Sequence, residues 1–263
     1  MPLRPAKQGV RASFERAAAS YDAAAGVQRQ VGERLLLGGA AEISDVLASA
    51  PHDILDAGCG TGYAARLLRQ RWPSSHITAV DFAPAMLALA RQEADCCLAA
   101  DIEALPFADA RFDAWCSNLA IQWCAASRVF NEAARVLRRG GRLAASTLAP
   151  GTFHELRDAF SGVDPYRHTL PFAEPEEIRS ALAAAGFQRI TLCRETFGAH
   201  YPDLKTLLRA VKAIGANRVG AGSRPGMMGR AAWRALEAAY ECQRARAGLP
   251  ASYDVLFCYA EKG

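Results

Sequence analysis

The chain has 263 residues, of which 51% are hydrophobic and 22% are charged, and its formal net charge is +4 at pH 7. These proportions are typical of a folded globular protein and exclude an intrinsically disordered one. No run of about 18 apolar residues occurs, so the sequence predicts no membrane span. The basic N-terminus lacks the apolar stretch of a secretory signal, and we therefore expect a cytoplasmic protein.

The eight cysteines form no C-x-x-C pair, and histidines do not recur near them. Several of them lie within apolar runs, where a free cysteine behaves as a small hydrophobic residue. We therefore expect reduced thiols, with neither a disulfide framework nor a metal site.

Residues 7–48 are rich in alanine, arginine, glutamine and leucine and are predicted to form helices, with Ser20 or Asp22 as the N-cap between two of them. Short apolar runs then alternate with helical segments. The predicted strands are residues 53–57, 77–80, 96–99, 112–117 and 143–148. The predicted helices are residues 61–71, 84–92 and 127–137, the last of which is stopped by Gly140-Gly141. This alternation indicates βαβ units and a parallel sheet.

The pattern changes after Pro150 and becomes mainly helical. A helix with its neighbouring loop is predicted over about 151–173, and another helix over 174–185. A strand over 189–196, a helical block over 203–247 and a last strand over 254–260 follow. The block contains the glycine-rich sequence GANRVGAGSRPGMMG, which predicts a mobile segment.

The first predicted strand leads into a glycine-rich loop, Asp56-Ala57-Gly58-Cys59-Gly60-Thr61-Gly62. Alternate glycines let the backbone turn tightly and approach a ligand at a helix N-terminus. Asp81 ends the second predicted strand, where a carboxylate can accept both hydroxyls of a ribose. The loop departs from the dinucleotide fingerprint G-x-G-x-x-G, because its third glycine comes one residue early. A tight turn with a purely structural acid is the alternative interpretation.

The motifs ILDAGCGTG, ITAVDFAPAML, AADIEALPF and RVLRRGGRL resemble those of class I S-adenosylmethionine (SAM)-dependent methyltransferases over about residues 52–148. The resemblance implies that Gly58, Gly60 and Gly62 line the methionine end of the cofactor. It implies that Asp81 holds the ribose and that Phe82 flanks the adenine. Asp101 with Ile102 would meet the exocyclic amine of the adenine, and Asn118 would face the methionine moiety.

The segment SNLAIQWC, residues 117–124, follows the fourth predicted strand and offers amides, an indole and aliphatic groups, without an acid or a base. Methyl transfer needs a base only when the nucleophile carries a proton that must leave. A carboxylate acceptor is already ionised at pH 7 and fits such a site. Gln122 and Trp123 are therefore predicted to contact the acceptor, with core packing as the alternative for Trp123. We expect positioning rather than acid–base catalysis.

Residues 203–234 contain seven cations and one acid. Lys205, Arg209 and Lys212 share one helix face, opposite an apolar stripe, and are predicted to bind an acidic substrate or partner. A solvated surface is the alternative. Nucleic acid would also fit the charge, but no aromatic residues interleave with the cations.

The flanking segments narrow the resemblance. FERAAASYDAAAGVQRQVGERLL, SNLAIQWC, LKTLLRAVKAIGAN, GRAAWRALEAAYE and LPASYDVLF resemble the malonyl-acyl-carrier-protein O-methyltransferases of biotin synthesis. The family implies methylation of the free carboxylate of a malonyl thioester on acyl carrier protein, with S-adenosylhomocysteine as the second product. It implies an N-terminal lid over the cofactor, in which Tyr21 and Gln28 contact the cofactor. Tyr21 is also the one candidate for a catalytic contact with the acceptor.

We therefore expect a Rossmann-like α/β domain over residues 49–263, with a seven-stranded, mostly parallel sheet that ends in an antiparallel hairpin. Residues 1–48 form a helical lid, and helical insertions occupy about 151–173 and 203–247. The protein is expected to be a monomer with no nucleic-acid or membrane partner. Two alternatives are a methyltransferase acting on a quinone precursor or a free acid, and a non-catalytic SAM-binding regulator.

Overall fold

The computed structural model describes residues 6–38, 50–213, 226 and 228–263. Its centre is a seven-stranded sheet in the order β3-β2-β1-β4-β5-β7-β6, in which β7 runs antiparallel to both of its neighbours. The strands are β1 Asp53–Ala57, β2 His76–Asp81, β3 Cys96–Ala99, β4 Phe112–Asn118, β5 Leu137–Leu148, β6 Phe187–Tyr201 and β7 Leu249–Lys262. The predicted Rossmann-like sheet with a terminal antiparallel hairpin is confirmed.

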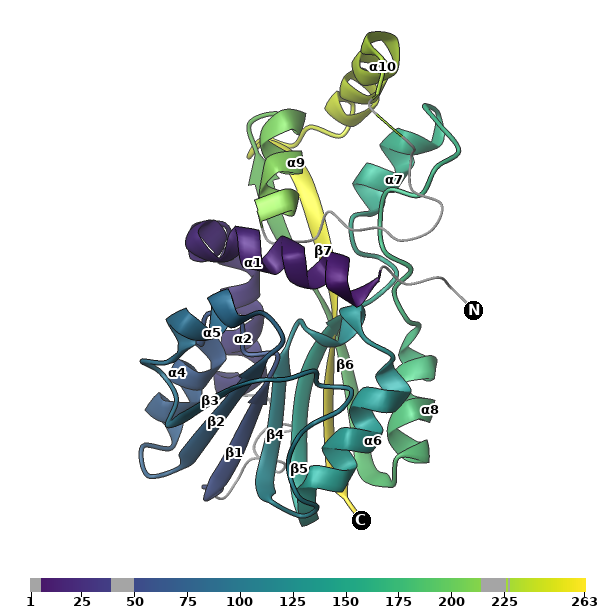
Figure 1. Ribbon diagram of the computed structural model, residues 1–263. Coiled ribbons are helices and arrows are strands. Elements are labelled where there is room, and N and C mark those ends of the chain that lie inside the picture. Colours follow the sequence, from purple (N-terminus) through teal and green to yellow (C-terminus); the bar gives the residue numbers. More distant parts are fainter. Residues whose placement is uncertain (1–5, 39–49, 214–225, 227) are drawn as a thin grey trace.

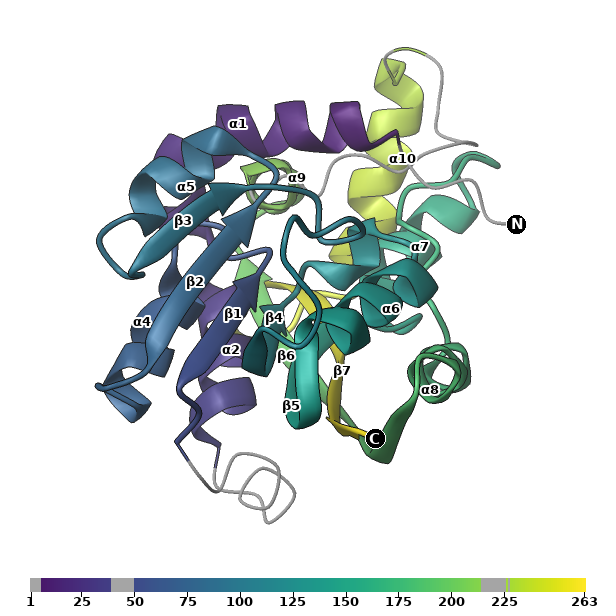
Figure 2. The same ribbon diagram turned by 60° about the horizontal axis from the view of Figure 1, so that its bottom comes forward.

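Helices cover both faces of the sheet, because successive residues of a strand point to opposite faces. Ile54 of β1 belongs to one hydrophobic core and Leu55 to the other, and both are fully buried. The helices α2 Gly26–Leu37, α4 Tyr63–Arg71 and α5 Pro84–Ala90 lie on one face. The helices α6 Ala126–Val136 and α8 Pro175–Ala184 lie on the other (Figures 1 and 2).

The remaining helices gather at the edge of the sheet where the parallel strands end (Figure 1). Helix α1, Lys7–Ala24, crosses this edge, and α7 His154–Ser161, α9 Leu204–Ala213 and α10 Arg230–Glu241 lie beyond it. The loops that follow β1, β2, β3 and β4 therefore lie beneath α1.

None of the helices in the described parts of the chain is long and apolar enough to cross a membrane.

Several boundaries differ from the sequence-based prediction. The break between α1 and α2 falls at Ala25, not at Ser20 or Asp22, and no side chain caps either helix there. Helix α6 ends at Val136, and Gly140-Gly141 lies inside β5, because Leu137 is already extended and buried. Strands β6 and β7 are longer than predicted, since they pair with each other along their whole length. Most of the glycine-rich segment 215–229 lies outside the described residues.

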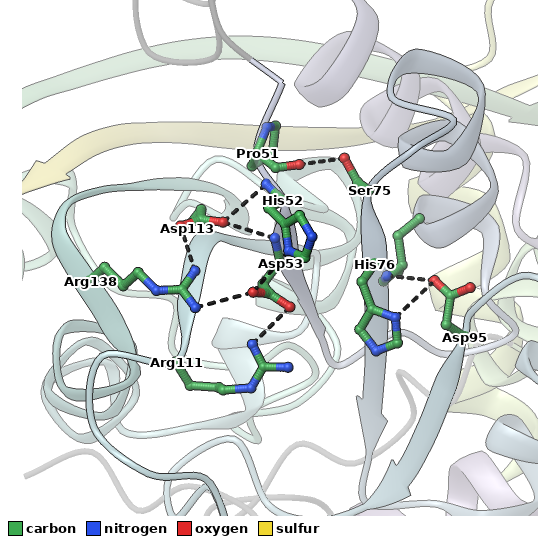
Figure 3. A network of polar contacts seen from close by, with 10 residues as sticks. Pro51, His52, Asp53, Ser75, His76, Asp95, Arg111, Asp113 and Arg138 are labelled. Carbon is green, nitrogen blue, oxygen red and sulfur yellow. Dashed lines mark hydrogen bonds and ion pairs between the residues drawn. The ribbon is translucent and has the colours of Figure 1, made fainter.

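An ion-pair network fastens the opposite end of the sheet (Figure 3). The Asp53 carboxylate accepts hydrogen bonds from Arg111 and Arg138 at 2.7 and 3.1 Å, and His52 lies 3.2 Å from it. Asp113 accepts from Arg138 and from the backbone N–H groups of His52 and Asp53. His52, Asp53 and Asp113 have the residue types of a metal site. Because two guanidinium groups already neutralise both carboxylates, the arrangement is that of a structural clamp across β1, β4 and β5.

Replacing Asp53 with asparagine is expected to lower the free energy of unfolding by about 2 kcal/mol at pH 7. Burial opposes ionisation of Asp53, but hydrogen bonds from Arg111, His52 and Arg138 outweigh it and lower the pKa from 3.8 to about 2. A carboxyl whose pKa is lowered by folding stabilises the protein above the unfolded pKa, by about 1.4 kcal/mol for each pH unit between the two pKa values. That stability is lost as pH falls toward 2. Denaturant titrations of both proteins at neutral and acidic pH measure the effect, and equal stability at pH 7 would contradict it.

Candidate active site

The loop after β1 brings the backbone close to the site. Gly58 and Gly60 have φ values of 75° and 54°, in the left-handed region that favours glycine. A Cβ atom on Gly58 would lie 2.4 Å from that of Ala120, so Gly58 allows the loops after β1 and β4 to touch. A Cβ atom on Gly60 would have no neighbour within 4 Å, because Gly60 faces open space. That space is the cradle into which a ligand could approach the backbone.

The third glycine of the loop has a different role. Gly62 precedes α4 with φ of 90°, and a Cβ atom there would lie 2.9 Å from the Cα of Ala90. It is buried and lines none of the cavities described below. Gly62 therefore allows α4 and α5 to pack closely, and does not contact the cavity.

Asp81 lies at the end of β2 with 7% of its surface exposed. One carboxylate oxygen accepts the Gly60 N–H at 3.0 Å and the other accepts the Ala83 N–H at 2.8 Å. Burial raises the pKa of Asp81 to about 6, against the effect of these hydrogen bonds. Each oxygen retains a lone pair for a further donor, so the carboxylate can also accept a pair of hydroxyls.

The open space in front of Gly60 extends past Asp81 to a far end that combines apolar walls with an ion pair. Phe82, Met86 and Ile102 line it, together with Asp101. Lys7 of α1 binds the Asp101 carboxylate and lies 3.0 Å from Glu103. Burial works against the charge of Lys7, but these hydrogen bonds raise its pKa, so the lysine stays charged. A ligand amine that reaches Asp101 would therefore share it with Lys7 or displace Lys7.

The end of β4 is strained and held in place. Leu119 has φ of 51°, which is costly for a residue with a side chain. Its N–H donates to the Ser146 hydroxyl and carbonyl at 3.0 and 3.1 Å. Asn118 accepts from the Ser146 hydroxyl at 2.8 Å and donates to the Gln28 carbonyl at 2.9 Å. One amide N–H of Asn118 remains for a ligand, and its orientation is fixed.

Helix α1 closes the site with aromatic side chains. Phe14 packs against Tyr21, Phe82 and Trp123, with ring centroids 6.3, 6.2 and 5.7 Å apart. The Thr61 hydroxyl of the glycine loop donates to Asp22 at 2.7 Å and ties α1 to the loop. Burial, with a smaller contribution from the charges of Asp81 and Asp22, raises the pKa of Tyr21, so its phenol remains a donor at neutral pH.

Three adjoining cavities result from this arrangement. The first is an open-sided space of about 650 Å³, its opening to solvent included, and runs from Gly58 and Gly60 past Asp81 to Asp101. The second continues along the glycine loop to Gln28 and shares Tyr21, Gly58, Gly60 and Asn118 with the first. The third lies beneath α1 and shares Tyr21 with both. One side chain thus borders all three spaces.

The structure brings most of the predicted site residues together at these cavities. Those that line at least one of them are Tyr21, Gln28, Gly58, Gly60, Asp81, Phe82, Asp101, Ile102, Asn118, Gln122 and Trp123. The exceptions are Gly62 and three cations of α9. Leu204, Leu207 and Val211 of that helix are buried, whereas Lys205, Arg209 and Lys212 are exposed on its outer face. These three cations line none of the cavities.

Sequence reasoning missed several residues of the site. Lys7 and Phe14 line the first cavity from α1, and Phe153 and Tyr253 line the third from distant parts of the chain. Asp56 is fully buried in β1 behind the glycine loop, and neither of its oxygens has a hydrogen bond of normal geometry among the described residues. Burial, followed by the charge of Asp81, raises the pKa of Asp56 to about 7 against a weak contact with the Ala65 N–H. An aspartate within a buried apolar strand was the available signal, because buried carboxylates are rare.

The cavities have the features that SAM requires. Gly60 leaves room at the backbone, Asp81 offers two oxygens beside it, and Phe82 and Ile102 form an apolar slot ahead of Asp101. Asp81 supplies a buried carboxylate beside the glycine loop. The residues present therefore fit this cofactor in size, polarity and charge.

Comparisons with known proteins agree with this geometry. A family model described as "Methyltransferase domain" matches residues 55–145. A crystal structure of a SAM-dependent methyltransferase from Thermotoga maritima, described as a possible histamine N-methyltransferase, superimposes with a TM-score of 0.56 at 18% identity. That match covers 95% of this chain and 99% of the other, and it shows the fold. The fold and the site define a class I methyltransferase.

Curated relatives specify the family. A malonyl-[acyl-carrier protein] O-methyltransferase from Dechloromonas aromatica is 49% identical over 98% of this chain and 96% of its own length. A protein of the same name from Herminiimonas arsenicoxydans is 43% identical over 95% of this chain and 94% of its own. The chain belongs to the malonyl-[acyl-carrier protein] O-methyltransferase family.

Proposed function

We propose that the protein transfers a methyl group from SAM to the free carboxylate of malonyl-acyl carrier protein, the step that begins pimeloyl synthesis for biotin. The observation that supports this proposal is that the proposed cofactor cavity adjoins the amide-lined third cavity, with Tyr21 lining both. The chain also belongs to the family of enzymes with this name. The methyl ester caps the charge of the malonyl group, so that chain elongation can treat it as an ordinary acyl primer.

The protein would hold the cofactor through the residues of the two larger cavities. Asp81 would accept the ribose hydroxyls, and Phe82 with Ile102 would enclose the adenine ahead of Asp101. Gly58, Gly60 and Asn118 border the methionine end. When bound, SAM supplies an activated methyl group on a positively charged sulfur. Phe14, Tyr21 and Trp123 cover this region and exclude water from it.

The acceptor needs alignment rather than a base. A carboxylate is ionised at neutral pH, so no proton has to leave before methyl transfer. The cavity under the lid presents the amides of Gln28 and Gln122 beside the indole of Trp123. Holding two reactants in line can contribute roughly 7–11 kcal/mol to the barrier reduction. Alignment of this kind accounts for catalysis in an acceptor cavity whose described lining has no carboxylate, imidazole or amine.

Helix α9 supplies a basic surface for the carrier protein. Helix α9 lies at the same edge of the sheet as the site (Figure 1), and its Lys205, Arg209 and Lys212 are exposed. Charged rim residues steer an oppositely charged partner and fix its orientation. An acidic carrier protein docked here would bring its malonyl arm to the lid.

Labelled SAM and malonyl-acyl carrier protein test the proposal directly. We expect the label to reach the carrier-bound malonyl group as an ester that mild base releases. Acetyl-acyl carrier protein, which has no free carboxylate, should take up no label. Labelling of an unattached acid or quinone precursor alone would identify a different methyltransferase. SAM binding without S-adenosylhomocysteine release in any acceptor mixture would identify a regulator.

Charge reversal on α9 tests the partner. The double change Lys205→Glu and Arg209→Glu is expected to raise KM for malonyl-acyl carrier protein about tenfold or more, because rim charges govern encounter. Affinity for SAM should not change, since neither residue lines the cavities. Arg139→Glu reverses one exposed charge at the other end of the sheet and is the control for charge reversal away from α9. Equal effects of the two variants would contradict docking on α9.

A further inference from the structure

The cavity under the lid contains polar groups but no charged side chain among the described residues that line it. Its polar side chains are two amides, Gln28 and Gln122, two phenols, Tyr21 and Tyr253, and the indole of Trp123. Phe14, Phe153 and Leu148 contribute to its apolar walls. The nearest predicted acceptor cations, those of α9, lie on an outer surface. A carboxylate in this cavity would therefore meet neutral donors only.

Gln122 is oriented as a donor. Its amide N–H donates to the Leu119 carbonyl at 2.5 Å, and its amide oxygen accepts from the Thr147 hydroxyl at 3.5 Å. Because one partner is an acceptor and the other a donor, these two contacts fix which end of the Gln122 amide is nitrogen and which is oxygen. An amide nitrogen carries two hydrogens, so the second N–H remains for a ligand.

Tyr253 lines the same cavity and is held in place. Its ring packs edge-on against Phe153 with centroids 4.8 Å apart, and its hydroxyl is paired with that of Tyr201. Because a phenol carries one hydrogen, Tyr253 donates to a ligand when its hydroxyl rotates toward the cavity and Tyr201 donates in the pair instead. The next residue, Asp254, is clamped by Arg194 at 2.7 and 2.5 Å and accepts the Gly151 N–H at 2.7 Å. This clamp fixes β7 against the loop that carries Phe153, and so fixes both aromatic rings.

We propose that Gln122 and Tyr253 hold the acceptor carboxylate as neutral hydrogen-bond donors, and that the site works without a protein cation beside it. The proposal rests on the function proposed above. A carboxylate oxygen forms the new C–O bond to the methyl carbon, the C–S bond breaks, and its electron pair stays on sulfur. The products are a neutral ester and a neutral thioether, and no proton moves.

Charge neutralisation explains why neutral donors suit this reaction. The reactants carry opposite charges that disappear in the transition state, so a dry, weakly polar site favours the reaction over the separated ions. A guanidinium or ammonium group would stabilise the carboxylate before reaction and would repel the sulfonium. Amide and phenol donors orient the carboxylate and leave its charge available. The cations of α9 are then left to bind the carrier, not the malonyl group.

Two substitutions test these positioning residues. Tyr253→Phe removes one donor and is expected to lower kcat for malonyl-acyl carrier protein about 10- to 100-fold. Gln122→Glu keeps the size of the side chain but introduces a negative charge facing the carboxylate, and should lower kcat/KM by at least about 100-fold. Both variants should bind SAM as the wild type does. Tyr240→Phe is the matched control, because it removes a buried phenol that donates to Pro250 and lines none of the cavities.

Separate measurement of kcat and KM distinguishes the contacts that dock the carrier protein on α9 from those that hold the acceptor carboxylate in the cavity. The α9 variant should change KM and leave kcat at saturating carrier unchanged, whereas the cavity variants should lower kcat. If Tyr253→Phe behaves like Tyr240→Phe, or if the α9 variant lowers kcat as the cavity variants do, this inference is overturned. If the wild type transfers no methyl group to malonyl-acyl carrier protein, the proposed function itself fails.

Discussion

Replacing Asp81 with asparagine is expected to weaken SAM binding about 10- to 100-fold, because hydrogen bonds to a charged group contribute about 1.5–3 kcal/mol each. The asparagine would keep one acceptor oxygen but would place an NH₂ group against the N–H of Gly60 or Ala83, both of which now donate to the carboxylate. Titration calorimetry with SAM at about pH 8, where Asp81 is ionised, measures the loss.

The pH dependence of SAM binding adds a second test of Asp81. Without cofactor, burial raises the pKa of this carboxyl to about 6. Ribose hydroxyls would donate to the ionised form and lower that pKa, so binding favours the deprotonated state. Affinity should therefore fall as pH decreases through about 6. The asparagine variant should lose this fall, whereas any change caused by Asp56, whose pKa is about 7, should remain in both proteins. Identical curves for the two proteins would disprove the role of Asp81.

Replacing Gly60 with alanine is expected to weaken SAM binding by about tenfold to a hundredfold, because overpacking a fitted site costs about 1–3 kcal/mol. The added methyl group would meet no protein atom within 4 Å and would instead project into the two cofactor cavities that Gly60 lines. Binding, rather than folding, should therefore bear most of the effect.

Gly140→Ala provides the control for backbone strain. Gly140 also has a positive φ, 70°, and a Cβ atom there would also have no neighbour within 4 Å, but it lies at the other end of the sheet. Both variants should lose similar thermal stability, since each forces a side chain into the left-handed region. Only Gly60→Ala should lose affinity for SAM. A Gly60→Ala protein that binds SAM normally would show that the cofactor lies elsewhere.

The order of helices and strands followed from local patterns, whereas their limits depended on pairing. The strand predictions for residues 53–57 and 96–99 agree with β1 and β3, because these strands are bounded by clear turns. The break at Ala25 was misplaced because an alanine-rich stretch carries no capping signal of its own. The extra length of β6 and β7 arises from their mutual hydrogen bonding, which no single segment encodes.

The candidate site was predictable only where its residues belong to a compact motif. Gly58, Gly60 and Asp81 lie at strand ends, so the alternating pattern places them at one edge. Lys7 and Tyr253 are separated by almost the whole chain and meet the site through tertiary packing. The spacing of Lys205, Arg209 and Lys212 predicted an exposed face, as observed, but spacing alone cannot say whether that face reaches a cavity.

The central claim is that the acceptor arrives ionised and that the protein positions it. The dependence of kcat on pH, at saturating SAM and malonyl-acyl carrier protein, tests this claim most directly. Because carboxyl groups of this kind ionise near about pH 3–4, kcat should stay constant within about twofold from about pH 7.5 to about 9. The buried Tyr21 phenol, with its raised pKa, should not titrate in this range. A tenfold rise in kcat per pH unit would show that a proton must leave the acceptor, and would contradict the account.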